Sequence, residues 1–357
     1  MRRVVALDWM RGIVMVLMAI DHASGAFNGG RLFTDAVFLY EPGSPLPAAQ
    51  FFTRWVTHLC APAFLFLAGT SLAISVERRR KAGLAVDGHI AVRALILLAL
   101  EVVWMSWAWQ MRWHAAFLQV LFAIGASLLV MIPLRRLPAV WLLAGGIVLT
   151  VASEWVVVRF DDVSWIAVLF SGGPIHASVE IWYPVVPWLA IMMIGWAFGR
   201  HLADGGRPEL PLWIGGAASL AVFALVRGVD GYGNLLLHRD DGSLIQWLHV
   251  AKYPPSLAFT ALELGIMALA LAGLFRLEGR IARPPTWSLV LGQTALFFYL
   301  LHAHLLEGAA KALGMSESGG LVETYLAAAA VLALLFPLCW WYRNYKQAHP
   351  RSLARFI

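Results

Sequence analysis

Long apolar stretches, separated by short polar segments, follow one another along the whole chain. A membrane-spanning helix needs about 20 mostly apolar residues. By that criterion we predict ten spans, at 4–23, 51–76, 90–110, 114–133, 138–158, 183–199, 210–226, 254–273, 286–305 and 321–342. The stretch 160–182 has room for one short extra or re-entrant segment, which would make eleven. The predicted fold is all-α, a polytopic helical bundle that forms one integral-membrane domain over residues 1–357.

The positions of Lys and Arg predict an orientation for this bundle. If the N-terminus is cytoplasmic, the inner segments carry 17 Lys and Arg residues and the outer segments carry 7. The remaining three of the 27 lie within predicted helices, at Arg11, Arg54 and Arg93. Cytoplasmic loops of membrane proteins carry such an excess, so we expect both termini in the cytoplasm. A cleaved signal peptide over residues 1–28 is disfavoured, because Asp8 and Arg11 interrupt its apolar region.

Composition excludes several other classes of protein. Apolar residues make up 60% of the 357 residues, and Asp, Glu, Lys and Arg make up only 13%, about half the ~25% of soluble domains. A cytosolic globular enzyme and a disordered protein are therefore excluded. The two cysteines, Cys60 and Cys339, lie in apolar runs and do not indicate a disulfide scaffold. The formal charge is +6. The basic residues lie mainly in the segments between the predicted spans and do not form a cluster, so we expect no nucleic-acid partner.

Charged residues within the predicted spans are costly and by default face a cavity or a partner. In the first span, Asp8 and Arg11 are three residues apart and can form an ion pair. Arg11 and His22 are eleven residues apart, which puts them on one helix face about 16 Å apart along the axis. They would line one groove, unless the ion pair is only interfacial and His22 only caps the helix.

The second and ninth spans carry the other candidate residues. Arg54 and His58 are four residues apart at a depth similar to Asp21, so Asp21 is expected to contact one of them rather than His22. Arg54 can alternatively extend to the interface. In the ninth span, His302 and His304 project to opposite sides and cannot share a metal ion. No Cys or carboxylate lies at ligand spacing, so no metal site is predicted.

Five motifs in this order resemble bacterial heparan-alpha-glucosaminide N-acetyltransferase-like membrane proteins. They are Leu7-Asp8-Trp9-Met10-Arg11-Gly12 closing in Asp21-His22, Phe51-Phe52-Thr53-Arg54 through Leu67-Ala68-Gly69-Thr70, Tyr183-Pro184-Val185-Val186-Pro187-Trp188, Lys252-Tyr253-Pro254-Pro255-Ser256-Leu257, and Phe298-Tyr299-Leu300-Leu301-His302. The Arg, ten residues, His pattern of the first motif is also similar to the wider class of membrane acyltransferases that modify cell-surface glycans. The resemblance covers most of the chain.

The resemblance implies transfer of an acyl group, typically acetyl, from a coenzyme A thioester at the cytoplasmic face. The acceptor would be a hydroxyl or amine, glycan-like, on the far side of a bacterial inner (cytoplasmic) membrane. His22 would act as general base, oriented by Asp21, with His58 as the second candidate base. Arg11 would meet a coenzyme A phosphate.

The remaining cofactor-binding expectations also follow from the matching motifs. Arg54 or Lys252 would serve the anionic donor or a developing oxyanion, and Tyr253 and His302 are expected to contact acetyl-CoA. His302 is in addition the third candidate base. The lysosomal branch has its catalytic histidine eleven residues after the position of Asp21, where this chain has Leu32.

Two other functions compete with acyl transfer. Buried polar residues can line the substrate path of a transporter or flippase, and an inactive partner subunit would keep the same fold. The expected partners are acyl-CoA, a glycan or other small acceptor, and membrane lipid, with a homodimer left open. Acyl transfer by the purified protein would separate the first function from the others.

Overall fold

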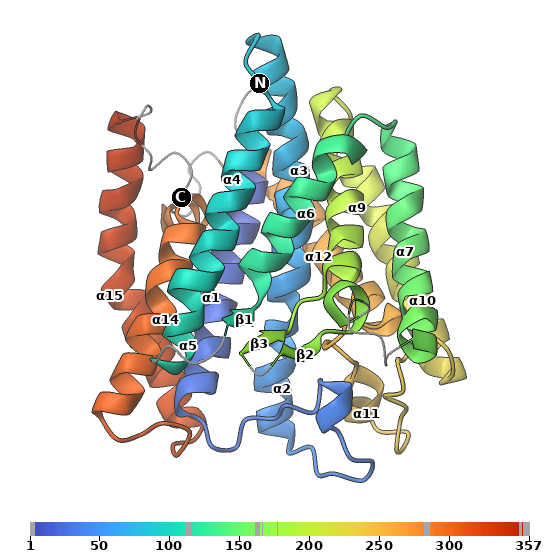
Figure 1. Cartoon of the computed structure of the whole chain (residues 1–357), viewed down its shortest axis with the longest axis vertical. Coiled ribbons are helices and arrows are strands. Elements are labelled where there is room, and N and C mark those ends of the chain that lie inside the picture. The colour runs from blue at the N-terminus through green and yellow to red at the C-terminus, as the bar shows by residue number, and fades with distance from the viewer. Residues whose placement is uncertain are drawn as a thin grey trace.

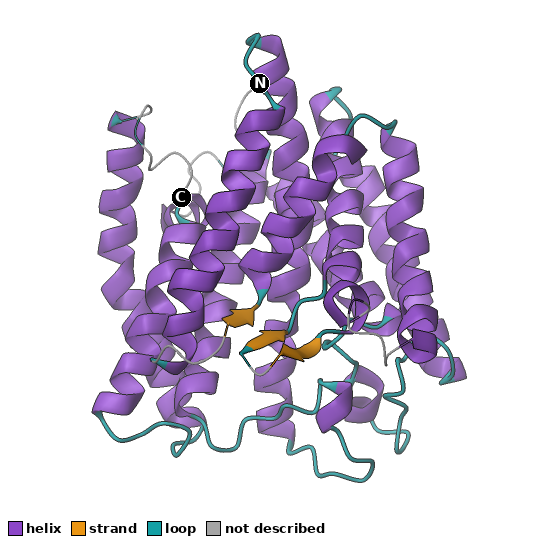
Figure 2. Cartoon of the chain, viewed as in Figure 1, coloured by secondary structure: helices purple, strands orange, loops and turns teal. Residues whose placement is uncertain are grey.

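The computed structural model is a bundle of helices, most of them running along its long axis (Figure 1). The structure describes residues 4–111, 116–160, 165, 167–176, 178–281, 286–349 and 352. Within these ranges helices dominate, and three short strands lie together in one small sheet (Figure 2). The predicted all-α class is confirmed.

The helices take up the apolar stretches of the chain. In order they are α1 (Val5–Phe27), α2 (Ala48–Val56), α3 (Cys60–Lys81), α4 (Asp87–Leu100), α5 (Ser106–Gln110), α6 (Val120–Leu134), α7 (Ala139–Phe160), α9 (Val185–Ala203), α10 (Glu209–Val229), α11 (Leu244–Leu248), α12 (Leu257–Glu278), α13 (Thr286–Gln293), α14 (Ala295–Ala312) and α15 (Leu321–Ala348). The 3-10 turns η1 (Val37–Leu39) and η2 (Thr57–Leu59) and the π-helical turns η3 (Glu101–Met105) and η4 (Ala167–Ser171) complete them.

The number of spans differs from the prediction. Among the described residues, seven helices are long and apolar enough to cross a membrane, or eight if α13 and α14 form one bent span. The predicted count of ten is not confirmed, although each predicted stretch overlaps a helix. The two that fall outside the count are α1, with 23 residues, and α6, with only 15.

Two predicted spans are not continuous helices. The stretch 114–133 contains strand β1 (Ala116–Leu118), and its helix begins only at Val120. The Leu118 carbonyl accepts hydrogen bonds from the amides of Trp182 and Tyr183, so a neighbouring loop satisfies this backbone. The stretch 286–305 breaks between α13 and α14, which are bent by 85°.

The predicted extra segment at 160–182 is, in its described part, turn η4 followed by two strands. β3 (Val179–Ile181) pairs in parallel with β1, and β2 (Gly173–His176) pairs with β3 in the antiparallel sense. Gly172 and Gly173 have φ values of 75° and 106°, which only glycine adopts readily. The described part of this stretch therefore ends in two strands of the small sheet.

Glycines bring α13 into direct backbone contact with α1. A Cβ atom on Gly12 would lie 2.1 Å from the carbonyl oxygen of Ser288, and one on Gly292 would lie 1.9 Å from that of Asp8. Small residues allow such close packing between helices in membranes. This contact fixes α13 beside the polar start of α1.

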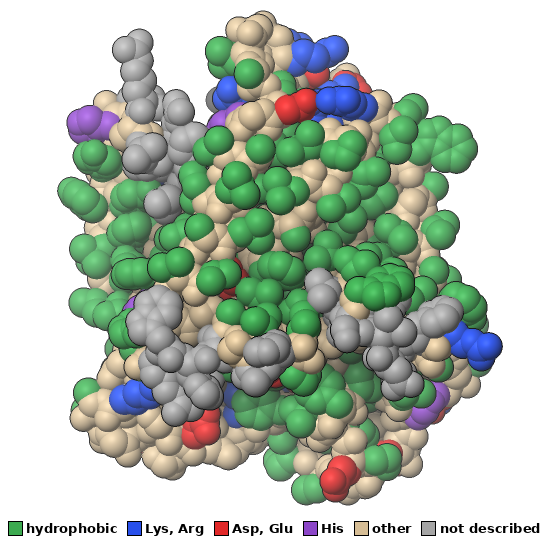
Figure 3. All heavy atoms as spheres, viewed as in Figure 1, with side chains coloured by type: hydrophobic (Ala, Val, Ile, Leu, Met, Phe, Trp, Pro, Cys, Tyr) green, Lys and Arg blue, Asp and Glu red, His purple; other side chains and the backbone are tan. Residues whose placement is uncertain are grey.

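The start of α1 and the end of α15 lie at the same end of the bundle, because Val4 and Lys346 line one cavity. We name this the inner end, and the opposite end, which carries loops 28–47 and 230–256, the outer end. Hydrophobic side chains cover most of the sides of the bundle, as Figure 3 shows for one face. That surface suits an integral membrane protein.

Candidate active site

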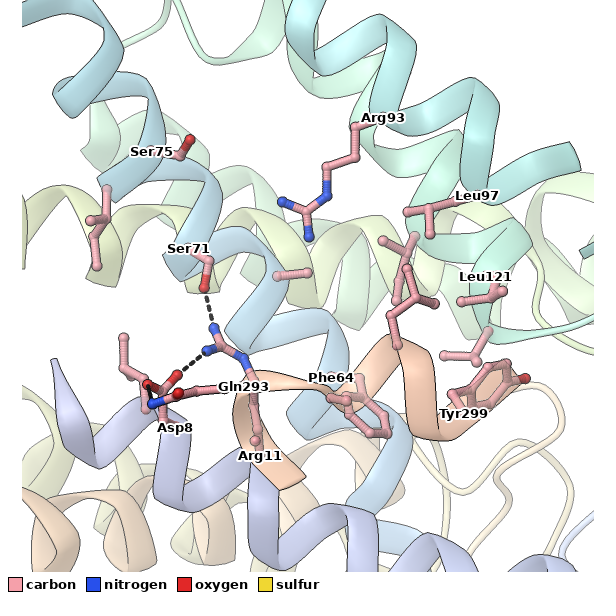
Figure 4. Close-up of a pocket in the computed structure, with 18 of the residues that line it drawn as sticks. Asp8, Arg11, Phe64, Ser71, Ser75, Arg93, Leu97, Leu121, Gln293 and Tyr299 are labelled. Carbon is pink, nitrogen blue, oxygen red and sulfur yellow. Dashed lines mark hydrogen bonds and ion pairs between the residues drawn. The ribbon is translucent and has the colours of Figure 1, made fainter. Parts of the chain in front are cut away.

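A cavity of about 700 Å³ lies among the helices at the inner end. Its lining comes from α1, α3, α4, α6, α13, α14 and α15 (Figure 4). Four lining residues are cationic, namely Arg11, Arg78, Arg93 and Lys346, whereas Asp8 is the acidic residue among the described lining. Such an excess of positive charge in a concave site favours an anionic ligand.

Arg11 forms the predicted ion pair and also lines the cavity, but His22 is not among the described lining residues, so the predicted groove shared by Arg11 and His22 is not confirmed. Its Nη1 donates to Oδ1 of Asp8 at 2.9 Å, which confirms the predicted ion pair. Its Nη2 donates to the Ser71 hydroxyl, and the guanidinium lies at the cavity surface (Figure 4). Gln293 of α13 donates to the other oxygen of Asp8 at 3.2 Å. Arg11 is therefore positioned by α3 and, through Asp8, by α13.

Arg93 presents the opposite situation. Its side chain extends from α4 into the cavity (Figure 4), and it makes no hydrogen bond or ion pair with any residue that the structure describes. An arginine within an apolar span is costly unless a partner neutralises it. A ligand in the cavity would supply that partner.

His22 of α1 and His302 of α14 form a buried pair. Nδ1 of His22 lies 2.5 Å from Nε2 of His302, and the two rings stack with centroids 4.8 Å apart. Nδ1 of His302 donates to the carbonyls of Phe298 and Tyr299, at 3.1 and 2.8 Å. With both rings neutral, Nε2 of His302 accepts the proton of His22 Nδ1. Nε2 of His22 then keeps its lone pair, as a general base requires.

Asp21 lies beside that lone pair. Its Oδ2 is 4.0 Å from Nε2 of His22, closer than the helical angle between neighbouring residues indicated. Its Oδ1 accepts hydrogen bonds from Arg54 at 2.6 Å, Arg31 at 2.9 Å and Thr57 at 3.0 Å. Of the two predicted partners of Asp21, Arg54 and His58, the structure shows Arg54, and the three donors fix the carboxylate in place.

Arg54 bridges two carboxylates. Besides Asp21, its guanidinium donates to Oδ2 of Asp35 at 2.6 Å, and Nε2 of His58 donates to the same oxygen at 3.1 Å. His58 thus contacts Asp35 rather than Asp21. Burial by itself raises the pKa of the Asp35 carboxyl, but Arg54 and His58 hold that pKa well below its ordinary value. We name Asp21, Arg54, Asp35 and His58 the outer charge network.

Two further titratable groups, Lys252 and Glu263, are buried next to this network, and neither forms an ion pair with a described residue. Lys252 is 2% exposed, its Nζ lies 5.1 Å from the centre of the Tyr253 ring, and it forms no ion pair within the described part of the chain. Glu263 of α12 is also 2% exposed, and its Oε1 has no hydrogen-bond partner among the described residues. Lys252 acts electrostatically on both Asp21 and Glu263.

The predicted donor-binding residues separate into two places. Arg11 lines the inner cavity, whereas Arg54, Lys252, Tyr253 and His302 do not. Tyr253 packs against cations, with the Arg54 guanidinium 5.9 Å from its ring centre. A role for the latter four residues in binding acetyl-CoA stays a prediction.

Some residues of the site were not assigned from the sequence. Arg93 carried a signal, since it lies inside an apolar span, but no motif linked it to Arg11. Asp35 and Arg31 come from the loop 28–47, where no periodicity indicates which side chains point inward. Lys346 lies beyond the last predicted span.

The second histidine of α14 faces away from the pair, as predicted. His304 lies between the indoles of Trp104 and Trp107, with ring centroids 4.5 and 5.3 Å away. Within the described ranges, no group of three or more His, Cys, Asp or Glu side chains is arranged to hold a metal ion.

Comparison with known families adds independent information. A family model described as "Heparan-alpha-glucosaminide N-acetyltransferase, catalytic" matches residues 3–228. This range includes the basic residues Arg11, Arg78 and Arg93, His22, and the whole outer charge network. No curated protein matches the chain.

Proposed function

The chain belongs to the heparan-alpha-glucosaminide N-acetyltransferase catalytic family, and from this premise we propose that it transfers an acetyl group from acetyl-CoA to an amine or hydroxyl acceptor. The donor would bind in the inner cavity, and the acceptor would reach His22 from the outer end. The family identifies a membrane acetyltransferase. The donor, the acceptor side and the residues below are our proposal.

One observation carries the proposal. Tyr299 lines the basic cavity, and its ring also packs against both imidazoles of the histidine pair, with centroids 6.3 Å from His22 and 5.5 Å from His302. A ligand that fills the cavity would therefore end next to the candidate base. Acetyl-CoA has this polarity, with phosphates at one end and the reactive thioester at the other.

The cavity suits the donor in size and charge. Ligand sites in proteins have volumes of roughly 300–1,000 Å³, and this one has about 700 Å³. Arg93 has no partner among the described residues, and the planar guanidinium binds phosphate by two parallel hydrogen bonds. Arg11, Arg78 and Lys346 line the same space. We expect these four residues to hold the phosphates.

The histidine pair suits proton transfer. Nε2 of His22 would take the proton of the acceptor as the acceptor atom attacks the thioester carbon. The carboxylate of Asp21 at 4.0 Å would stabilise the imidazolium that forms. Asp21 keeps its charge in this environment because Arg31 and Arg54 both donate to it.

Lys252 and Glu263 would contribute on the acceptor side. Both are buried without a direct ion-pair partner in the described chain, and a polar acceptor that reaches them would supply a partner for the Lys252 ammonium and for Oε1 of Glu263. The family is named for a glucosaminide acceptor, so a glucosaminide is the first acceptor to test.

We also propose that the inner end faces the cytoplasm of a bacterium and that the chain resides in its inner membrane. The 17-to-7 distribution of Lys and Arg supports this orientation, and so does the basic cavity at the end where coenzyme A is made. Reporter fusions that place the C-terminus outside would contradict it.

The test uses purified protein in detergent, acetyl-CoA, and glucosamine or a methyl glucosaminide as acceptor. Release of coenzyme A that depends on both substrates, with formation of the N-acetyl product, is expected. His22→Ala should lower the rate by about 10²–10⁴-fold, while His304→Ala should leave it unchanged. Movement of a solute across proteoliposomes without any acetylated product would instead indicate a transporter.

A further inference from the structure

Tyr299 closes the inner cavity where the cavity meets the histidine pair. It belongs to α14, one turn before His302, and it is only 4% exposed. Figure 4 shows its ring at the opposite end of the cavity from Ser71 and Asp8. An acyl group carried into the cavity by a donor anchored near Arg11 and Arg93 would therefore meet this phenol before it meets His22.

The hydroxyl of Tyr299 has no hydrogen-bond partner among the residues that the structure describes, and it is buried. Buried hydroxyl groups nearly always have a partner, so this one calls for a physical reason. Glu101 acts on Tyr299 electrostatically, and its Oε2 accepts a hydrogen bond from the amide of Phe122 at 2.9 Å, but its buried Oε1 forms no hydrogen bond with Tyr299 or any other described residue. The Tyr299 hydroxyl is therefore available as a hydrogen-bond donor at the end of the cavity nearest the histidine pair.

We propose that the Tyr299 hydroxyl donates a hydrogen bond to the acyl carbonyl oxygen of the donor and stabilises the negative charge that develops there. This assignment rests on the proposed function. The acceptor atom forms a bond to the thioester carbon and gives its proton to Nε2 of His22, while the carbonyl oxygen becomes an alkoxide that Tyr299 binds. The C–S bond then breaks, the carbonyl re-forms, and coenzyme A leaves as a thiolate that is protonated on release.

Tyr299 acts through its backbone as well as its side chain. Its backbone carbonyl accepts from Nδ1 of His302 at 2.8 Å, which sets the tautomer of the pair. Its side chain lies between the cavity and the pair, so the hydroxyl on α14 can bind the carbonyl oxygen while His22 on α1 takes the proton of the acceptor. Donors aimed at the site of developing charge are typical of acyl-transfer enzymes.

A binding experiment separates this assignment from the function on which it rests. S-acetonyl-CoA keeps a carbonyl near the position of the thioester but cannot transfer an acyl group, and coenzyme A lacks that carbonyl. Calorimetry on the full-length protein should show that wild type prefers S-acetonyl-CoA by roughly 2–10-fold, the value of one ordinary hydrogen bond. Tyr299→Phe should bind coenzyme A as wild type does but lose this preference. Tyr345→Phe, an exposed tyrosine on α15, is the matched control and should keep it.

The rate provides the second measurement. Tyr299→Phe should lower kcat by about 10²–10³-fold, as the removal of one oxyanion donor does, with little change in KM. Its melting temperature should not fall, because the hydroxyl makes no hydrogen bond within the described protein. A lower melting temperature with unchanged kcat would assign the hydroxyl a structural role and overturn the proposal.

Failures of the two proposals are distinguishable. If wild type binds neither ligand, or binds both without acetylating any acceptor, the proposed function is wrong and the Tyr299 assignment falls with it. If wild type acetylates an acceptor but Tyr299→Phe keeps the preference for S-acetonyl-CoA, only the Tyr299 assignment is overturned.

Discussion

The outer charge network and Arg93 of the inner cavity differ in how their charges are balanced. In the outer charge network every charged group has a counter-charge, since Arg54 lies 2.6 Å from both Asp21 and Asp35. In the inner cavity Arg93 has no ion pair with any described residue, and the cations outnumber the acidic residues of the described lining. Charged side chains within a membrane protein cost free energy in either region. The comparison indicates that the ion pairs of the outer charge network stabilise the fold. The proposed role of Arg93 is instead to bind an anionic ligand.

The largest expected effect comes from breaking the outer charge network. Arg54→Met would leave Asp21 with Arg31 as its remaining arginine partner and Asp35 with only His58 as an ion-pair partner, and loss of one partner of a buried pair typically costs about 3–5 kcal/mol. We expect a strongly lowered melting temperature in detergent, or no folded protein. Arg276→Met is the control, because Arg276 is exposed and contacts only the Trp213 ring in the described structure. Equal melting temperatures for the two variants would show that the network does not hold the fold.

Substitution of Arg93 in the inner cavity should lower ligand affinity without lowering thermal stability. Arg93→Gln should weaken acetyl-CoA binding by about 10–100-fold, because a hydrogen bond to a charged group contributes roughly 1.5–3 kcal/mol. Its melting temperature should stay the same or rise, since no described partner is lost. Arg280→Gln removes an exposed arginine outside the cavity lining and should change neither quantity. A destabilised Arg93→Gln protein with normal affinity would remove the contrast between the two regions.

Sequence reasoning reached the outer charge network more completely than the inner cavity. Asp21 and Arg54 lie in regular helices, where angular spacing indicates which side chains meet, and their contact was predicted. Asp35 escaped prediction because it lies in the irregular loop 28–47. The cavity escaped it because seven helices far apart in the chain contribute the lining, and Arg93 and Lys346 join Arg11 only in three dimensions.

The fold shows the same limit. Apolar stretches identified where the helices lie, but apolarity does not register a break such as that between α13 and α14. On one side of that break, Gly12 and Gly292 let α13 pack directly on α1. Strand β1 in place of a helical turn depends on a partner strand more than 60 residues away, since Ala116 pairs with Val179.

Arg11 combines the two situations, because it forms an ion pair with Asp8 and also lines the inner cavity. Arg11→Lys keeps the charge for Asp8 but loses the planar fork that binds phosphate. Since Arg11 both pairs with Asp8 and lines the cavity, we expect acetyl-CoA affinity to fall several-fold, by less than for Arg93→Gln, with little loss of thermal stability. Calorimetry and melting curves on the same preparation measure both. Preserved affinity in Arg11→Lys, together with lower stability in Asp8→Asn and Arg11→Ala, would make Arg11 structural only.

The smallest expected effect is the contribution of Asp35 to the pH dependence of thermal stability. Its pKa in the folded protein is held well below the ordinary value, so its contribution to stability is fully present above the unfolded pKa, near 3.9, and is lost as pH falls below it. Between pH 7.5 and 5 we expect no loss from this group. Below about pH 4 the wild-type melting temperature should fall, and Asp35→Asn should flatten that acid slope. An unchanged slope in Asp35→Asn would mean that Asp35 is not held ionised by Arg54.

The most direct measurement of the central claim is a cryo-EM structure of the full-length protein with S-acetonyl-CoA. The account predicts nucleotide and phosphate density in the inner cavity beside Arg11, Arg93 and Lys346, with the acetonyl group at Tyr299 next to His22 and an unchanged outer charge network. Density for the nucleotide at the outer end, with Arg54 or Lys252 on the phosphates and an empty inner cavity, would contradict it.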